Sequence, residues 1–152
     1  MIKKYFSIVL IMFALFSMKT AQANELVDML VSKLGINNTQ ASAGVGVILN
    51  YLKSQVSTED FDVVSDGFDG AGAFLKAADE AGAYKENKVS KFGKTVSSAT
   101  NTATGLVGST SSSFKNLGLK AENIIQYLDV MVSYLEEKGS AQAASILQNL
   151  VN

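Results

Sequence analysis

Four aspartates crowd a short stretch of the chain and could together bind a metal ion. They are Asp60, Asp62, Asp66 and Asp69. Carboxylate oxygens are the hard ligands that calcium prefers, but this spacing fits no EF-hand loop. Aspartates at a helix start or in a glycine turn also stabilise those structures without an ion. We therefore predict no metal site here.

A serine and a lysine follow the spacing of a nucleophile motif. Ser112 and Lys115 satisfy Ser-x-x-Lys, and Ser65-Asp66-Gly67 is similar to a second motif of the penicillin-binding proteins. The two motifs stand in the wrong order, Lys-Thr-Gly is missing, and 152 residues are too few for that fold. The sequence therefore predicts no activated serine.

The chain contains no histidine and no cysteine. It lacks the commonest general base, the commonest transition-metal ligand and any thiol nucleophile. We expect a protein that is not an enzyme, with no catalytic, cofactor-binding or metal-binding residues and no cofactor. Since no disulfide can form, its stability must come from an apolar core.

The first 23 residues predict a signal peptide. A positive start, an apolar run and small residues at a cleavage site are present at Lys3 and Lys4, Ile8 to Met18, and Ala21-Gln22-Ala23. The apolar run is shorter than the ~20 residues that span a bilayer. A retained membrane anchor or a buried helix is the alternative. Cleavage would leave residues 24–152 as a soluble chain in the periplasm or outside the cell.

The charge of this mature chain argues against a nucleic-acid partner. Ten lysines stand against fourteen acidic residues, a formal charge near −4, and there is no arginine. Proteins that bind nucleic acid or anionic lipid display basic clusters, which are missing here.

One helical pattern occurs twice. Residues 32–64 align without a gap on residues 115–147, at a constant offset of 83. The identical pairs are Leu34/Leu117, Gly35/Gly118, Val47/Val130, Tyr51/Tyr134, Leu52/Leu135 and Ser57/Ser140. The apolar positions recur as well, on one face of a helix. They are Ala41, Val45, Ile48, Leu49 and Leu52 in the first copy and Ile124, Leu128, Met131, Val132 and Leu135 in the second.

Helix ends recur at the same offset. Glycine tolerates the left-handed conformation that closes a helix, so Gly35 and Gly118 each predict the end of a first helix. Ser57 and Ser140 stand where a third helix begins, and Asp60 completes a Ser-x-x-Asp capping box with Ser57.

The predicted fold is therefore all-α, a small helical bundle built from two similar three-helix units. The units cover residues 24–68 and 103–152 and form a single domain around a pseudo-twofold axis. The alternative is two ordinary amphipathic helices that happen to look alike. In the second unit, the region matching the first helix is richer in serine and poorer in leucine.

Residues 69–102 predict a flexible, partly helical connector. From 90 to 113, sixteen of 24 residues are Ser, Thr, Gly or Asn, which favours a chain with little to bury. A competing pattern of apolar residues at helical spacing runs from Val89 to Leu106. Upstream, a short alanine-rich helix is expected to carry Phe74, Leu75 and Ala78 inward.

Two glycines and two tyrosines predict details of the packing. Gly44 and Gly46 within a helix cost ~2 kcal/mol together relative to alanine, so we expect them to permit close helix packing. Pairing within a membrane is the alternative. Tyr51 and Tyr134 are expected to cap the core with a solvated hydroxyl rather than to form a ligand cage.

Four segments carry a resemblance to a known family. They are Leu34-Gly35, the glycine- and alanine-rich segment from Gln40 to Leu49, the segment from Phe114 to Leu119, and the helix end from Leu135 to Ser140. With the signal peptide, they make nearly the whole chain resemble the VcgC/VcgE-like family of exported bacterial proteins of unknown function. The resemblance implies export and an all-helical fold, and it supplies no activity and no site.

The function expected from the sequence is binding rather than catalysis. We expect an exported module that binds an unknown protein partner or self-associates through an apolar face. The alternative is a membrane- or lipid-associating helical protein, which the 47% hydrophobic composition and the glycines within helices suggest.

Overall fold

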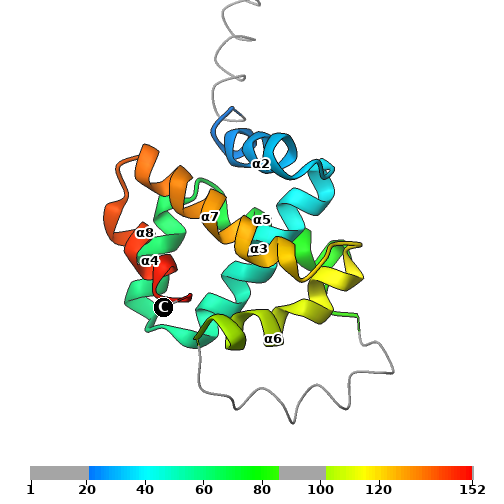
Figure 1. The fold of residues 1–152 in the computed structure, drawn as a ribbon. Coiled ribbons are helices and arrows are strands. Elements are labelled where there is room, and N and C mark those ends of the chain that lie inside the picture. Colours follow the sequence, from blue (N-terminus) through cyan, green and yellow to red (C-terminus); the bar gives the residue numbers. More distant parts are fainter. Residues whose placement is uncertain (1–20, 86–101, 152) are drawn as a thin grey trace, which may run out of the picture.

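The structure is a computed structural model that describes residues 21–85 and 102–151, where it contains seven helices and no strand (Figure 1). The helices are α2 (Ala21–Leu34), α3 (Asn38–Gln55), α4 (Thr58–Gly67), α5 (Ala71–Glu80), α6 (Thr102–Asn116), α7 (Glu122–Glu137) and α8 (Ala141–Gln148). The predicted all-α class is confirmed. The apolar run of the predicted signal peptide and residues 86–101 of the predicted connector lie outside the described residues.

Glycines and polar caps set the helix ends. Gly35 and Gly118 have φ angles of 65° and 76°, the left-handed conformation predicted for them. Ser57 caps α4, where its side chain accepts a hydrogen bond from the Asp60 backbone N–H at 3.2 Å. Ser140 stands at the start of α8 but makes no such bond, because its backbone does not adopt the extended conformation of a cap. The helix start predicted at Ser140 is confirmed, because α8 begins at the next residue.

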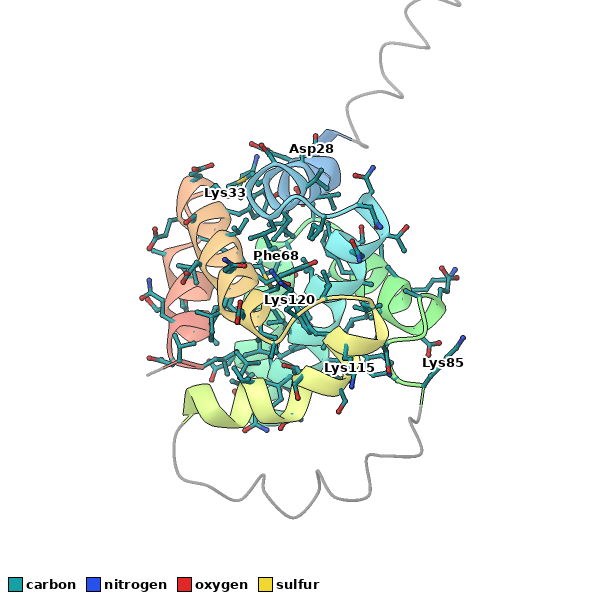
Figure 2. All side chains as sticks on the ribbon, turned by 45° about the vertical axis from the view of Figure 1, so that its right-hand side comes forward. Asp28, Lys33, Phe68, Lys85, Lys115 and Lys120 are labelled. Carbon is teal, nitrogen blue, oxygen red and sulfur yellow. The ribbon has the colours of Figure 1, made fainter. Side chains whose placement is uncertain are left out.

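The core is one apolar cluster around α3 and α7, which cross near its centre (Figure 1). α3 packs most extensively against α5 and also contacts α2, α6 and α7, while α7 contacts α8, α2 and α6. All ten matched apolar side chains of α3 and α7 are buried, as their spacing predicts. Figure 2 places Phe68 among the packed helices and Lys85 and Lys115 at the periphery.

Two glycines allow α3 to approach its neighbours closely. A Cβ atom on Gly46 would lie 2.0 Å from the backbone oxygen of Phe74 in α5. A Cβ atom on Gly44 would lie 2.3 Å from a ring carbon of Tyr127 in α7. The prediction that these glycines permit close helix packing is confirmed.

α5 lies within the stretch predicted as a connector and is an ordered part of the fold. Phe74 and Ala78 are buried against α3 and Leu75 is half-buried, as expected for the alanine-rich helix. The glycine at position 46 is the reason that α5 can pack so closely there.

The matched tyrosines of α3 and α7 occupy different environments. Tyr51 is half-buried, in agreement with the expected solvated cap. Tyr134 is only 2% exposed, and its ring stacks on that of Phe68 with 5.9 Å between the centroids. The expectation for Tyr134 is wrong, because Phe68 covers its ring.

A third tyrosine, Tyr127, is buried in the core with its hydroxyl satisfied. The hydroxyl donates a hydrogen bond to the backbone oxygen of Gln40 at 2.7 Å, and the ring meets Phe114 edge-on. Gln40 also closes a capping box with Asn37 at the start of α3 and donates to the Leu117 oxygen at 3.0 Å. These bonds join the start of α3 to α7 and to the turn after α6.

Tyr127→Phe should lower stability near neutral pH and lose that effect in alkali. Removing the hydrogen bond costs about 1 kcal/mol. Burial raises the pKa of Tyr127 above its ordinary value of 10.0. The folded state therefore keeps the proton while the unfolded chain loses it, so the wild type loses stability as pH rises above 10. We expect urea unfolding to give a difference of about 1 kcal/mol at pH 8 that shrinks to near zero by pH 11. A difference that is constant with pH would contradict the assigned burial.

Candidate functional site

The aspartates considered as calcium ligands do not form a metal-binding group. Asp62, Asp66 and Asp69 are exposed and Asp60 is half-buried. Within residues 21–85 and 102–151, no group of three or more acidic, histidine or cysteine side chains is placed to hold a metal ion.

The residues of the two nucleophile-like motifs lie on different helices. Ser112 and Lys115 are exposed on α6, whereas Ser65 lies half-buried on α4, which packs against α8. Among the described residues, no hydrogen bond joins these three side chains, so the fold does not assemble the motifs into a site.

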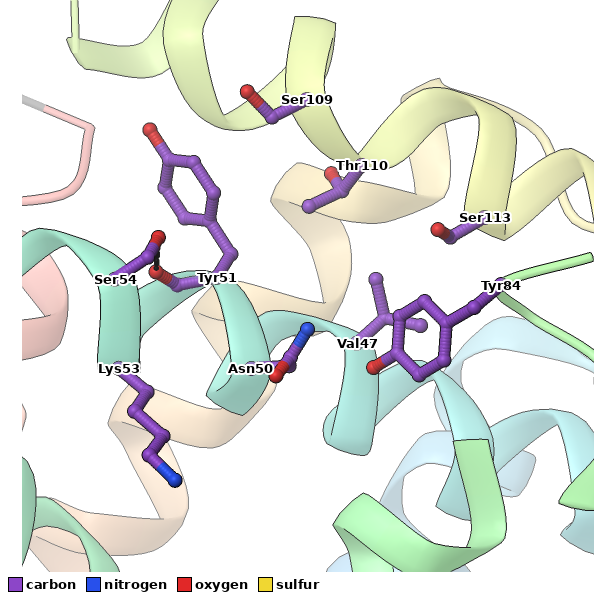
Figure 3. A pocket seen from close by; sticks show the side chains of 9 residues that line it. All are labelled: Val47, Asn50, Tyr51, Lys53, Ser54, Tyr84, Ser109, Thr110 and Ser113. Atoms are coloured by element: carbon purple, nitrogen blue, oxygen red, sulfur yellow. Dashed lines mark hydrogen bonds between the residues drawn. The ribbon is translucent and has the colours of Figure 1, made fainter. Parts of the chain in front are cut away.

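The fold instead gathers polar and aromatic side chains in a groove between α3 and α6 (Figure 3). Its volume is about 520 Å³. The α3 wall carries Val47, Asn50, Tyr51 and Ser54, and the α6 wall carries Ser109, Thr110 and Ser113. Tyr84, which follows α5, stands at the opposite end of the groove from Tyr51 (Figure 3).

Some hydroxyls of this groove are used within the protein and others are not. Ser54 donates to the Tyr51 backbone oxygen and Thr110 to the Leu106 backbone oxygen, both at 2.6 Å. The hydroxyl of Thr110 therefore donates within α6, and its methyl group remains for contact with a ligand. In the part of the chain that the structure describes, the hydroxyls of Tyr51, Ser109 and Ser113 make no hydrogen bond. Three hydroxyls are thus available to a ligand.

The Tyr84 ring is held at its end of the groove by the backbone around it. Gly82 turns the chain with a φ of 79°. The Asn116 side chain on α6 then donates to the backbone oxygens of Ala83 at 2.9 Å and Lys85 at 2.8 Å. Burial raises the pKa of Tyr84, with a smaller contribution from Asp79 and an opposing one from a hydrogen bond with Asn50. Tyr84 is nevertheless 40% exposed.

Asn116→Ala should release the segment that carries Tyr84. Loss of two hydrogen bonds of about 1 kcal/mol each should speed amide hydrogen exchange at residues 82–85 by roughly tenfold or more. Hydrogen-exchange mass spectrometry measures this directly. Asn149→Ala, at an exposed position after α8, is the control and should leave exchange at residues 82–85 unchanged. Equal exchange in both variants would show that Asn116 does not hold the segment.

Lys53 is the one charged side chain among the described residues that line the groove. Its side chain points away from the others (Figure 3). Its Nζ lies 5.9 Å from the centroid of the Phe61 ring, outside the groove. The described side chains that face into the groove are therefore uncharged.

The physical reason for the groove is visible at the other end of the fold. α2 packs against α7, as α6 packs against α3. At an offset of 83, the buried residues of α2 correspond to smaller or more polar residues of α6. The pairs are Leu26/Ser109, Val27/Thr110 and Leu30/Ser113. Serine is smaller than leucine, and Ser109, Thr110 and Ser113 line the groove on its α6 side.

Sequence reasoning did not predict this site. Asn50 and Tyr84 carried no motif, and only the three-dimensional fold brings Tyr84 beside α6. The available signal was serine at the α6 positions that align, at an offset of 83, with leucines of α2. The capping box of Asn37 and Gln40 was also missed, although Asn-x-x-Gln before an apolar run predicts it.

The described residues define a small all-helical protein with a polar and aromatic groove between α3 and α6. The chain belongs to the family described as "Protein of unknown function VcgC/VcgE (DUF2780)", whose model matches residues 15–151. The resemblance seen in the sequence is thereby confirmed. No curated protein and no solved structure gave a match to this chain.

Proposed function

We propose that this chain is an exported, non-enzymatic helical module that binds a protein partner or a second copy of itself. The α3–α6 groove is the observation that carries the proposal. Tyrosine, serine and asparagine are enriched in the binding loops of antibodies. Tyrosine gives rigid contact area there, and serine and asparagine give adaptable hydrogen bonds. Export to the periplasm or the medium is supported by the sequence of residues 1–23.

The proposed scaffold is a pair of similar three-helix units, α2–α4 and α6–α8. Its support is the packing pattern, which is largely unchanged when the units are exchanged. α2 packs on α7 as α6 packs on α3, α3 crosses α7, and α4 packs on α8. α5 packs on α3 and has no counterpart among the described helices on α7. A unit alone would expose the apolar face that the other covers.

Sedimentation and crosslinking of the mature protein test the proposal. We expect residues 24–152 to show either a mass that rises with concentration or one specific crosslinked protein in cells that export them. A protein that is monomeric at all concentrations and yields no specific crosslink would contradict it.

The membrane-associating alternative leads to a different expectation. No helix within the described ranges is long and apolar enough to cross a membrane. The matched apolar side chains of α3 and α7 are buried in the core rather than available to lipid. We expect the mature protein to stay at the bottom of a gradient in liposome flotation, whereas co-flotation would favour the alternative.

A further inference from the structure

The α3–α6 contact is one place where the two proposed units differ. α2 packs against α7, and its side chains Leu26 and Leu30 are buried, at 1% and 0% exposed. At the α3–α6 contact, Ser109 and Ser113 occupy the corresponding positions, and a volume of about 520 Å³ stays open.

We infer that this groove binds an uncharged peptide segment of another protein, whose aliphatic side chain fills the space that leucine fills at the α2–α7 contact. The inference rests on the proposed function and names its site and its class of partner. A volume of about 520 Å³ lies within the ~300–1,000 Å³ typical of ligand pockets. The groove therefore takes a few side chains of a segment rather than a whole domain.

The lining supports a peptide with an apolar side chain at its centre. Val47 and the methyl group of Thr110 form the buried floor. The rings of Tyr51 and Tyr84 stand at the two ends (Figure 3). An aliphatic side chain on this floor would lie between two aromatic rings, which is the apolar centre of a protein interface.

The rim supports recognition of the peptide main chain. The free hydroxyls of Tyr51, Ser109 and Ser113 can each donate and accept a hydrogen bond. A peptide main chain offers neutral donors and acceptors in alternation, so its groups would stay paired when they leave water. Since none of the described side chains that point into the groove is charged, a charged side chain of the peptide would lose its hydration there without gaining a partner from them.

A filled-groove variant tests the inference without weakening the fold. Ser109→Leu with Ser113→Leu introduces the residues that close the α2–α7 contact, and we expect its melting temperature to equal or exceed that of the wild type. The probe is a phage-displayed library of random 12-residue peptides, selected on the mature wild-type protein. Ser112→Leu is the matched control, because it adds a leucine to an exposed position of α6 outside the groove.

Selected peptides should be uncharged around an aliphatic residue. Calorimetry should show at least a tenfold weaker Kd for the filled variant and an unchanged Kd for Ser112→Leu. In NMR titrations, the amide shifts should centre on residues 47–54 and 109–113. Equal binding to the filled variant, selection of charged peptides, or no enrichment over an unrelated helical protein would each overturn the inference.

Failure of this inference can be told apart from failure of the proposed function. If the filled variant still crosslinks the same partner as the wild type, the module binds proteins but through another surface. If the wild type self-associates and the filled variant is monomeric, a second copy occupies the groove and the assignment to another protein is wrong. Absence of both self-association and a crosslinked partner in the wild type contradicts the proposed function itself.

Discussion

Leu52→Asp and Leu135→Asp should each unfold the protein at neutral pH. Both leucines are 0% exposed, at matched positions of α3 and α7. An aspartate there places a carboxylate in the core without a partner, at a cost of more than about 4 kcal/mol. That cost is comparable with the ~5–15 kcal/mol that holds a typical domain together. Far-UV circular dichroism during urea unfolding measures the loss.

Two comparisons separate this effect from simple loss of packing. Leu135→Met keeps an apolar side chain of similar volume and should cost less than about 1.5 kcal/mol. The aspartate variants should also recover stability toward pH 4, because burial raises the pKa of a carboxyl group and the protonated form is less costly to bury. Unchanged urea midpoints for both aspartate variants would mean that these faces are not core.

Gly46→Ala should destabilise the protein by about 2–4 kcal/mol, although alanine is the better helix former by about 1 kcal/mol. The added Cβ would lie 2.0 Å from the Phe74 oxygen and 2.6 Å from its carbonyl carbon. A backbone group cannot rotate away as a side chain can, so α5 must shift and expose Phe74 and Ala78. Urea unfolding gives the free energy, and faster hydrogen exchange confined to α5 would locate the change.

Gly108→Ala is the matched control for this prediction. Gly108 is exposed in the middle of α6, and a Cβ there would meet nothing within 4 Å. Alanine should therefore stabilise the protein by about 0.5–1 kcal/mol through helix propensity alone. If Gly46→Ala were as stable as Gly108→Ala, the close contact of α3 with α5 would be refuted.

Local patterns account for the parts of the fold that could be predicted. The spacing of apolar residues on α3 and α7 identified their buried faces, because the period of a helix is fixed by its own backbone. Gly35 and Gly118 identified two helix ends for the same reason, since a left-handed residue is a local requirement. The duplicated architecture, the export and the absence of enzymatic activity stay predictions.

The candidate site could be predicted only in part. Serine in place of leucine on α6 predicted a less apolar helix face, but it did not predict that this face forms the wall of a groove. Tyr84 is placed at that groove by the turn at Gly82 and by the two hydrogen bonds that the Asn116 side chain donates to the backbone around it. These two features come from different parts of the chain. The burial of Tyr134 likewise depends on Phe68, which its own helix does not reveal.

The sequence by itself determined that the chain is helical, where several helices end and which faces of α3 and α7 are buried, because each of these follows from spacing along one segment. Only the tertiary structure decided which helices meet. The arrangement of the helices brings Gly46 against α5, buries Tyr134 and leaves Tyr51 beside an open groove. The two matched tyrosines differ in this way because burial is a property of what packs against a side chain. Phe68 stacks on the Tyr134 ring, whereas Tyr51 faces an α6 wall that carries Ser109 and Ser113.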